Sequence, residues 1–224
     1  MCNSIGGVTQ KHAIKFYVQL AFGEKAKDVF DAKNFDDLVR SCLRASWGPA
    51  FKHVSDNTKD YNVKKDSKKE EMIQGCINDL FDKYCAYFEE NNKSKYLSDN
   101  LGYFQEKIKD VKEVGSNEHP ISLGHFQKLF NMTTKHLLTL YMLRKYIWGN
   151  NKPFKTFKGK IKDCFENADC PIDSKILENL YDNKKYNKKT WSQFKDIKDY
   201  DQVQSDIQKQ ANGNSNLYYD FENW

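Results

Sequence analysis

The sequence contains few of the residues that interrupt helices. Only 4 prolines and 11 glycines occur among 224 residues, too few for the frequent tight turns of a β-sandwich. No stretch alternates apolar and polar residues between hairpin turns, and no segment repeats along the chain. The chain is therefore expected to be built from helices.

Long apolar runs and metal or disulfide motifs are also missing. No run approaches the roughly 20 apolar residues of a membrane span, and the start MCNSIGGVTQKH lacks the basic and apolar regions of a signal peptide. The six cysteines include no C-x-x-C pair and no neighbouring histidine cluster, which argues against structural zinc. We predict a cytoplasmic protein with reduced thiols and without membrane contact, metal or cofactor.

Arginine is scarce, whereas lysine is abundant. Lysine and arginine number 36 against 31 aspartates and glutamates, a net charge of +5, but only Arg40, Arg44 and Arg144 are arginines. Because lysine is a strongly hydrated point charge, much of this charge can serve solubility alone. Lysine clusters at 64–69 and 184–189 still permit a polyanionic partner, although dedicated nucleic-acid-binding proteins are usually more basic.

The apolar content predicts a folded helical protein. Hydrophobic residues make up 39% and aromatic residues 14% of the chain, which is typical of a buried core and not of disorder. Apolar residues at helical spacing indicate helices over 8–23, 24–32, 34–47, 67–91, 94–114, 122–148, a lysine-rich 154–167, 171–181 and 190–211. We expect flexible stretches at 54–65 and 212–216.

These helices predict an all-α bundle of eight or nine helices around a buried central helix, 122–148. The domain is expected to span 1–224, with two possible subdomains, 1–114 and 115–224, that share this helix. Three boundaries rest on local signals. Pro49 should end one helix, Pro171 could occupy the first position of another, and Thr190-x-x-Gln193 should start a third as a capping box.

The central helix carries an unusual line of polar residues. On a helical wheel its apolar side chains cover most of the circumference, and Lys128, Asn131 and Lys135 share a band of roughly 60° on the opposite side. One interpretation is the narrow exposed strip of an otherwise buried helix. The other is a strip that contacts phosphates, in which lysine supplies charge and asparagine supplies hydrogen bonds.

Catalytic motifs give little support for an enzyme. The sequence lacks Walker A, G-x-G-x-x-G, G-x-S-x-G and H-E-x-x-H patterns. His125, in the first turn after Ser122, could act as a general base if neutral, but both His125 and His136 could equally be structural histidines. An Arg followed closely by His would suit a ribonuclease of the all-helical HEPN type, but Arg44 and His53 are too far apart.

Three segments together resemble a loosely defined group of bacterial and phage-borne helical proteins. They are GHFQKLFNMTTKHLLTLYML (124–143), CPIDSKIL (170–177) and TWSQFKDIKDYDQV (190–203), and the resemblance covers 120–205. It implies no named activity, but it implies a role in phage conflict or on a mobile element. It directs attention to His125, Gln127, Lys128, Asn131, Cys170, Pro171, Asp173 and Trp191.

We therefore predict a non-enzymatic binding protein that acts on nucleic acid or on a nucleic-acid-handling complex. The predicted contact residues are His125, Gln127, Lys128, Asn131 and Lys135. Two alternatives remain open: a metal-independent HEPN-like ribonuclease toxin with His125 as base, and a protein-interaction module that uses the aromatic C-terminal tail, 217–224.

Overall fold

The computed structural model describes residues 4–5, 8–55, 67–113, 121–149, 152–181, 191–194 and 196–223. In these ranges the α-helices are α1 (Gln10–Phe22), α2 (Ala26–Asp31), α3 (Phe35–Ser55), α4 (Ser67–Glu89), α5 (Lys93–Glu113), α6 (Leu123–Trp148), α7 (Ile161–Glu166), α8 (Ser174–Tyr181), α9 (Ile197–Gln210) and α10 (Asn216–Asn223). The 3-10 helices are η1 (Gly23–Lys25), η2 (Pro153–Thr156) and η3 (Trp191–Gln193), and β1 (Ser4–Ile5) pairs antiparallel with β2 (Val8–Thr9).

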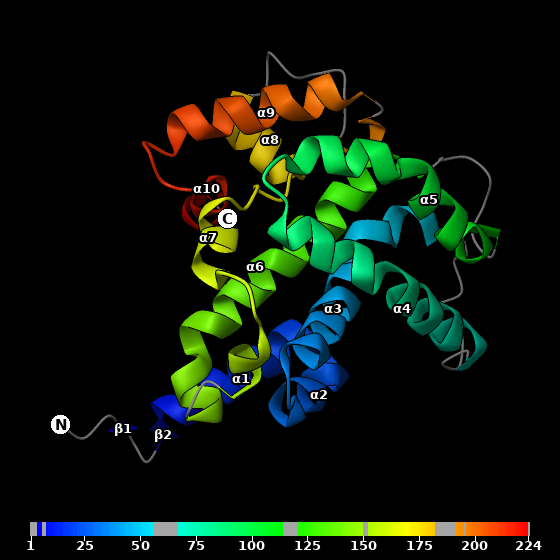
Figure 1. Ribbon diagram of the computed structural model, residues 1–224. Helices are drawn as coiled ribbons and strands as arrows, with labels where there is room; N and C mark the ends of the chain where they lie inside the picture. The colour runs from blue at the N-terminus through cyan, green and yellow to red at the C-terminus, as the bar shows by residue number, and fades with distance from the viewer. Residues whose placement is uncertain are drawn as a thin grey trace.

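The all-α bundle around one central helix is confirmed. α6 runs through the middle of the molecule, with α3 beside it, α4 and α5 to one side and α8, α9 and α10 toward one end (Figure 1). Its bounds match the prediction, because Ser122 supplies the cap before a long apolar pattern. Among the described helices, α3 packs most extensively against α6.

Aromatic side chains fill the space between α6 and its neighbours. Phe126 of α6 stacks on Phe104 of α5 with ring centroids 4.5 Å apart, and Phe130 meets Tyr84 of α4 edge-on at 5.3 Å. Offset and edge-on pairs of this kind stabilise beyond their area burial. One cluster of buried residues contains side chains from both halves of the chain. Whether 1–114 and 115–224 behave as subdomains stays a prediction.

The predicted end of a helix at Trp47-Gly-Pro49 is wrong, because α3 continues through Pro49 to Ser55. Trp47, Ala50 and Phe51 are all buried on either side of the proline. Their packing outweighs the lost hydrogen bond and the steric preference of the residue before proline. Residues 54–55, predicted as loop, therefore belong to α3, and 56–65 lie outside the described residues.

Three other predicted helices are shorter than expected. The 154–167 segment divides into η2 and α7, because Phe157 turns into the core beside Phe35, with ring centroids 4.6 Å apart. The predicted start at Thr190 is wrong for α9, which begins at Ile197 with the Asp196 carboxylate accepting from Lys198 N. Similarly α8 begins at Ser174, where Asp173 Oδ1 accepts from Ile176 N (3.0 Å).

The segment before α10 forms a turn. Asn212 and Gly213 have φ of 51° and 85°, in the left-handed region that asparagine and glycine tolerate best. The flexibility predicted for 212–216 stays a prediction. Within the described ranges, no helix has both the length and the apolar character required to cross a bilayer.

Candidate functional site

The polar line of α6 lies inside the protein. Asn131 is 1% exposed, and the side chains of Lys128 and Lys135 are only 12% and 14% exposed. The expectation of an exposed strip is therefore wrong. A wheel describes how side chains are arranged around one helix, but it does not show which other segments of the chain cover that helix.

Asn131 of this line and the neighbouring Gln127 bind the chain segment that follows α7. Gln127 Nε2 donates to Ile172 O (2.8 Å), and Gln127 Oε1 accepts from Ile172 N (3.1 Å). Asn131 Nδ2 donates to Cys170 O (3.1 Å). Buried backbone groups outside regular elements need such partners. Two of the three segments of the resemblance, on α6 and at 170–177, thus contact each other directly.

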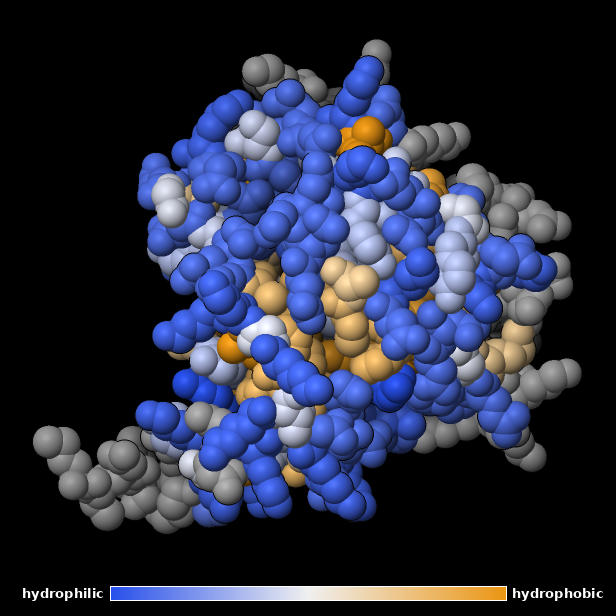
Figure 2. Space-filling view, viewed as in Figure 1, coloured by the Kyte–Doolittle hydropathy of each residue, from blue (hydrophilic) through white to orange (hydrophobic). Residues whose placement is uncertain are grey.

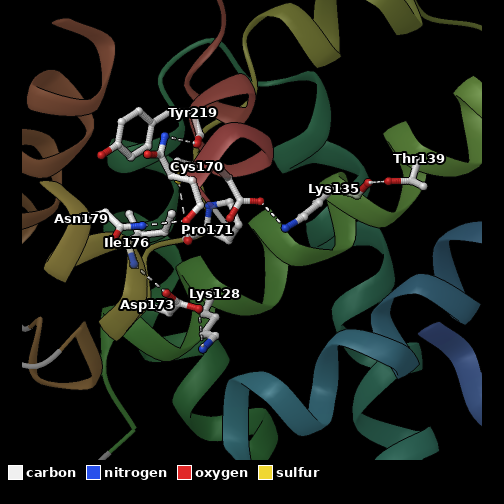
Figure 3. Close-up of polar contacts among 11 residues, drawn as sticks. Lys128, Lys135, Thr139, Cys170, Pro171, Asp173, Ile176, Asn179 and Tyr219 are labelled. Atoms are coloured by element: carbon white, nitrogen blue, oxygen red, sulfur yellow. Dashed lines mark hydrogen bonds and ion pairs between the residues drawn. The ribbon is translucent and has the colours of Figure 1, made fainter. Parts of the chain in front are cut away.

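The two lysines of the line form internal ion pairs. Lys128 Nζ lies 3.7 Å from Asp173 Oδ2, and Lys135 Nζ lies 2.5 Å from Asp220 Oδ2 on α10. Figure 3 shows both lysines projecting from α6 toward these C-terminal segments. Burial lowers the pKa of Lys128, an effect that Asp173 opposes. Charges paired in this way are not available to an outside phosphate unless the pairs break.

His125 caps the first turn of α6. Its Nδ1 accepts from Ser122 N (3.1 Å), so the ring proton lies on Nε2. Ser122 Oγ lies 2.9 Å from the same nitrogen and donates to Ser192 O (2.6 Å). The ring is 2% exposed, parallel to Phe51 at 6.0 Å. This is the arrangement of a structural capping residue, and it does not favour the ribonuclease alternative.

Other candidate catalytic groups are buried as well. Burial, together with the charge of Lys135, lowers the pKa of His136 to about 4, so its ring is neutral near pH 7. Burial also raises the pKa of the Cys170 thiol well above its ordinary value, which disfavours the nucleophilic thiolate. In the described part of the chain, no three His, Cys, Asp or Glu side chains are grouped as a metal site.

The aromatic C-terminal segment packs on its own protein. In α10, Leu217 is fully buried and Tyr219 is 4% exposed, whereas Tyr218 and Phe221 are each 44% exposed. Asn216 Nδ2 donates to Gln204 Oε1 of α9 (3.0 Å). The segment is therefore part of the core, which weakens the alternative of a free interaction tail.

Asn131 also joins a chain of hydrogen bonds that ends at a carboxyl group. The Tyr87 hydroxyl donates to Asn131 Oδ1. Asn131 Nδ2 donates to the Tyr200 hydroxyl (3.0 Å), which donates to Asp169 Oδ2 (2.7 Å). Asp169 lines a cavity of about 230 Å³ beside the start of α5 and α9. The network connects α4, α6 and α9 through one asparagine.

Burial raises the pKa of Asp169 to about 6. The hydrogen bond from Tyr200 and the charge of Lys93 oppose this rise, and Asp201 adds to it. Lys93 itself is 4% exposed and donates to backbone carbonyls at the end of α4. Asp169 therefore gains its proton at a higher pH in the native state than in the unfolded chain.

Replacing Asp169 with asparagine is expected to change the pH dependence of stability. Between the unfolded pKa of about 3.9 and the native pKa of about 6, the native state binds the extra proton. The wild-type free energy of unfolding should therefore rise relative to that of Asp169→Asn as the pH falls from about 7 to 4, by at most about 3 kcal/mol. Urea unfolding across this range measures the difference.

The comparison with Asp169→Asn separates this effect from that of His136. The lowered pKa of His136 acts in the opposite direction, because the unfolded chain then binds the extra proton as the pH falls, but it contributes equally to both proteins. Asp28→Asn, at an exposed position of α2, should follow the wild-type curve. If the free energies of unfolding of wild type and Asp169→Asn changed in parallel with pH, the raised pKa assigned to Asp169 would be contradicted.

A second candidate site is the segment 152–162, which we call the basic segment. It contains five lysines and no acidic residue, and all five are exposed: Lys152, Lys155, Lys158, Lys160 and Lys162. Helical periodicity predicts these residues only as part of a lysine-rich helix. The run of lysines without a carboxylate was the signal that could have identified them as a site.

The basic segment is held in place by its non-lysine residues. Phe154 is 6% exposed, and the Phe157 ring packs against Phe35 (4.6 Å). Thr156 Oγ1 accepts from Phe35 N (2.8 Å) at the start of α3. Figure 2 shows hydrophobic residues in the middle of a mostly hydrophilic face, where α3, α4 and the η2–α7 region converge. The lysines therefore project from an anchored backbone.

Comparison of the chain with protein-family models, with curated proteins and with solved structures gives no match. The resemblance to phage-borne helical proteins consequently stays a prediction. The site must be interpreted from its own chemistry.

Proposed function

We propose that this protein is a non-enzymatic binding protein whose partner is nucleic acid, contacted through the basic segment. The observation that carries the proposal is the set of five exposed lysines within eleven residues, counted from 152 to 162, on an anchored backbone. Lysine side chains on such a surface bind phosphates and release condensed counterions, which is the main source of sequence-independent affinity.

The line on α6 supports this assignment less well. Lys128 and Lys135 already have carboxylate partners within the protein, and Gln127 and Asn131 hold the backbone at 170–172. In the basic segment, by contrast, the shortest lysine–carboxylate pair among the described residues joins Lys160 and Asp163, at 3.8 Å. A role in phage conflict or on a mobile element is part of the proposal and rests on the resemblance alone.

The test replaces Lys152, Lys155 and Lys158 with glutamine. Fluorescence anisotropy with labelled DNA and RNA at about 50 mM salt should show affinity falling at least about tenfold. The slope of log K against log salt should decrease by about 0.7–0.9 for each phosphate that the variant no longer neutralises. The anchoring residues Phe154, Thr156 and Phe157 are unchanged, so the melting temperature should stay near that of the wild type.

A matched variant controls for net charge. Lys11, Lys15 and Lys198 are exposed and lie on α1 and α9, and their replacement by glutamine removes the same charge. This variant should bind within about twofold of wild type. Equal losses in both variants would show that overall charge, not the basic segment, drives binding. Absence of wild-type binding to DNA and RNA would overturn the proposed function.

A further inference from the structure

A small cavity opens beside the basic segment, between the turn after α4 and α7. Its volume is about 190 Å³, smaller than the roughly 300–1,000 Å³ of sites for drug-sized ligands. Its lining includes Phe88, Glu89, Asn91, Lys160, Asp163 and Asn167. Lys160 belongs to both the cavity and the basic segment. An ideal Cβ on Gly159 would lie 3.6 Å from the Glu89 carboxyl carbon, so the backbone of the segment passes beside the cavity.

The lining suits an uncharged, flat group that carries N–H donors. Phe88 and Cys164, which are 1% and 9% exposed, form the buried floor of the cavity, and its accessible lining is mostly polar. Glu89, Asp163 and the amides of two asparagines supply acceptors around it. The carboxylates of Glu89, Glu90 and Asp163 repel a phosphate, so the cavity disfavours the anion that the neighbouring lysines attract. The flat surface and edge donors of a nucleobase match this combination.

The carboxylates that line the cavity also favour some bases over others. The Glu90 side chain is already used by the turn, because its Oε1 accepts from Asn91 N (2.8 Å) and Asn92 N (3.0 Å). The exposed Glu89 is the better placed acceptor. Guanine presents adjacent N1–H and N2–H₂ donors on its pairing edge, which two carboxylate oxygens can accept together. Uracil has one donor between two acceptors, and those acceptors would face the carboxylate.

We propose that the basic segment binds single-stranded nucleic acid and that the cavity accepts one unpaired base, guanine in preference to uracil or thymine, with Glu89 as the recognising residue. This inference rests on the proposed function. In a duplex the pairing edges are occupied and the bases are stacked, so the cavity is reachable only from a single strand or by costly base flipping.

The test uses oligouridylate of about 12 nucleotides, within the usual range of site sizes, and the same oligomer with one central guanosine. Thymidine oligomers with and without one central deoxyguanosine repeat it for DNA. Wild-type protein should bind the guanine-containing oligomer about tenfold tighter, the size of one good bidentate base contact. A duplex of equal length should show no gain from guanine.

Glu89→Gln is the informative variant. It removes a negative charge, so binding to plain oligouridylate should strengthen slightly, whereas the guanine preference should fall to about twofold or less. Glu166→Gln, at an exposed position of α7 outside the cavity lining, removes the same charge and should keep the full preference. Loss of the guanine preference in Glu89→Gln but not in Glu166→Gln would not follow from a change in electrostatics alone.

The outcomes separate this inference from the proposed function. Binding that disappears when Lys152, Lys155 and Lys158 are replaced but is indifferent to guanine would overturn the base site and leave the proposed function intact. A guanine preference unchanged in Glu89→Gln would also overturn it. Absence of binding to all oligomers would overturn both.

Discussion

Gly124→Ala is expected to destabilise the protein by about 3 kcal/mol or more. An ideal Cβ at this position would lie 1.8 Å from Trp191 O and 2.8 Å from its carbonyl carbon. Because the obstacle is backbone and not the end of a flexible side chain, η3 must move away from α6. The Ser122–Ser192 hydrogen bond (2.6 Å) and the contact of Lys128 with the Trp191 ring (4.3 Å) would weaken with it. Urea unfolding measures the loss.

Gly75→Ala provides a control in which the same substitution should raise the stability of the protein. Gly75 lies within α4, is exposed, and has no atom within 4 Å of an ideal Cβ. Alanine should therefore stabilise this helix by up to about 1 kcal/mol, the intrinsic difference between the two residues. If Gly124→Ala were stabilising by a similar amount, the close contact between α6 and η3 would be refuted.

Lys135→Met is expected to cost about 3–5 kcal/mol near neutral pH. It leaves Asp220, which is 1% exposed, without the ammonium group that lies 2.5 Å away. Burial raises the pKa of Asp220, and Lys135 opposes that rise. Without Lys135 the carboxyl group should take up a proton at still higher pH, so the destabilisation should shrink as the pH falls. Urea unfolding at several pH values tests both statements.

Two further variants isolate the ion pair. Lys145→Met replaces an exposed lysine near the end of α6 and should change stability by no more than about 0.5 kcal/mol. The double variant Lys135→Met/Asp220→Leu removes both charges and should be more stable than Lys135→Met alone, because no unpaired carboxylate remains buried. If Lys135→Met were as stable as Lys145→Met, the Lys135–Asp220 ion pair would contribute little to stability.

These two substitutions also show how the polar line of α6 could be misinterpreted. Lys128, Asn131 and Lys135 follow one another at helical spacing, a pattern equally typical of a solvent-exposed strip and of a polar interface inside the protein. The choice depends on Asp173 and Asp220, distant in the sequence, and on backbone groups at 170–172. No periodicity within α6 carries that information.

The basic segment shows the opposite situation. Its five lysines are visible in the sequence, but periodicity alone assigns them to an ordinary amphipathic helix. The position of Phe157 against Phe35 ends that helix and turns the segment into an anchored surface. Similarly, Pro49 is a strong local stop signal, but it is overridden by the burial of Trp47 and Phe51 on the same helix.

By itself, the sequence determined the helical class, the extent of α6 and its start at Ser122, because helical periodicity and capping act over a few residues. Tertiary structure alone decided that His125, Asn131 and Lys135 face inward, that the C-terminal segment packs on the core, and that the lysines of 152–162 project from an anchored backbone. Each of these depends on contacts between segments far apart in the chain, and it is these contacts that set the surroundings and charge of every candidate residue.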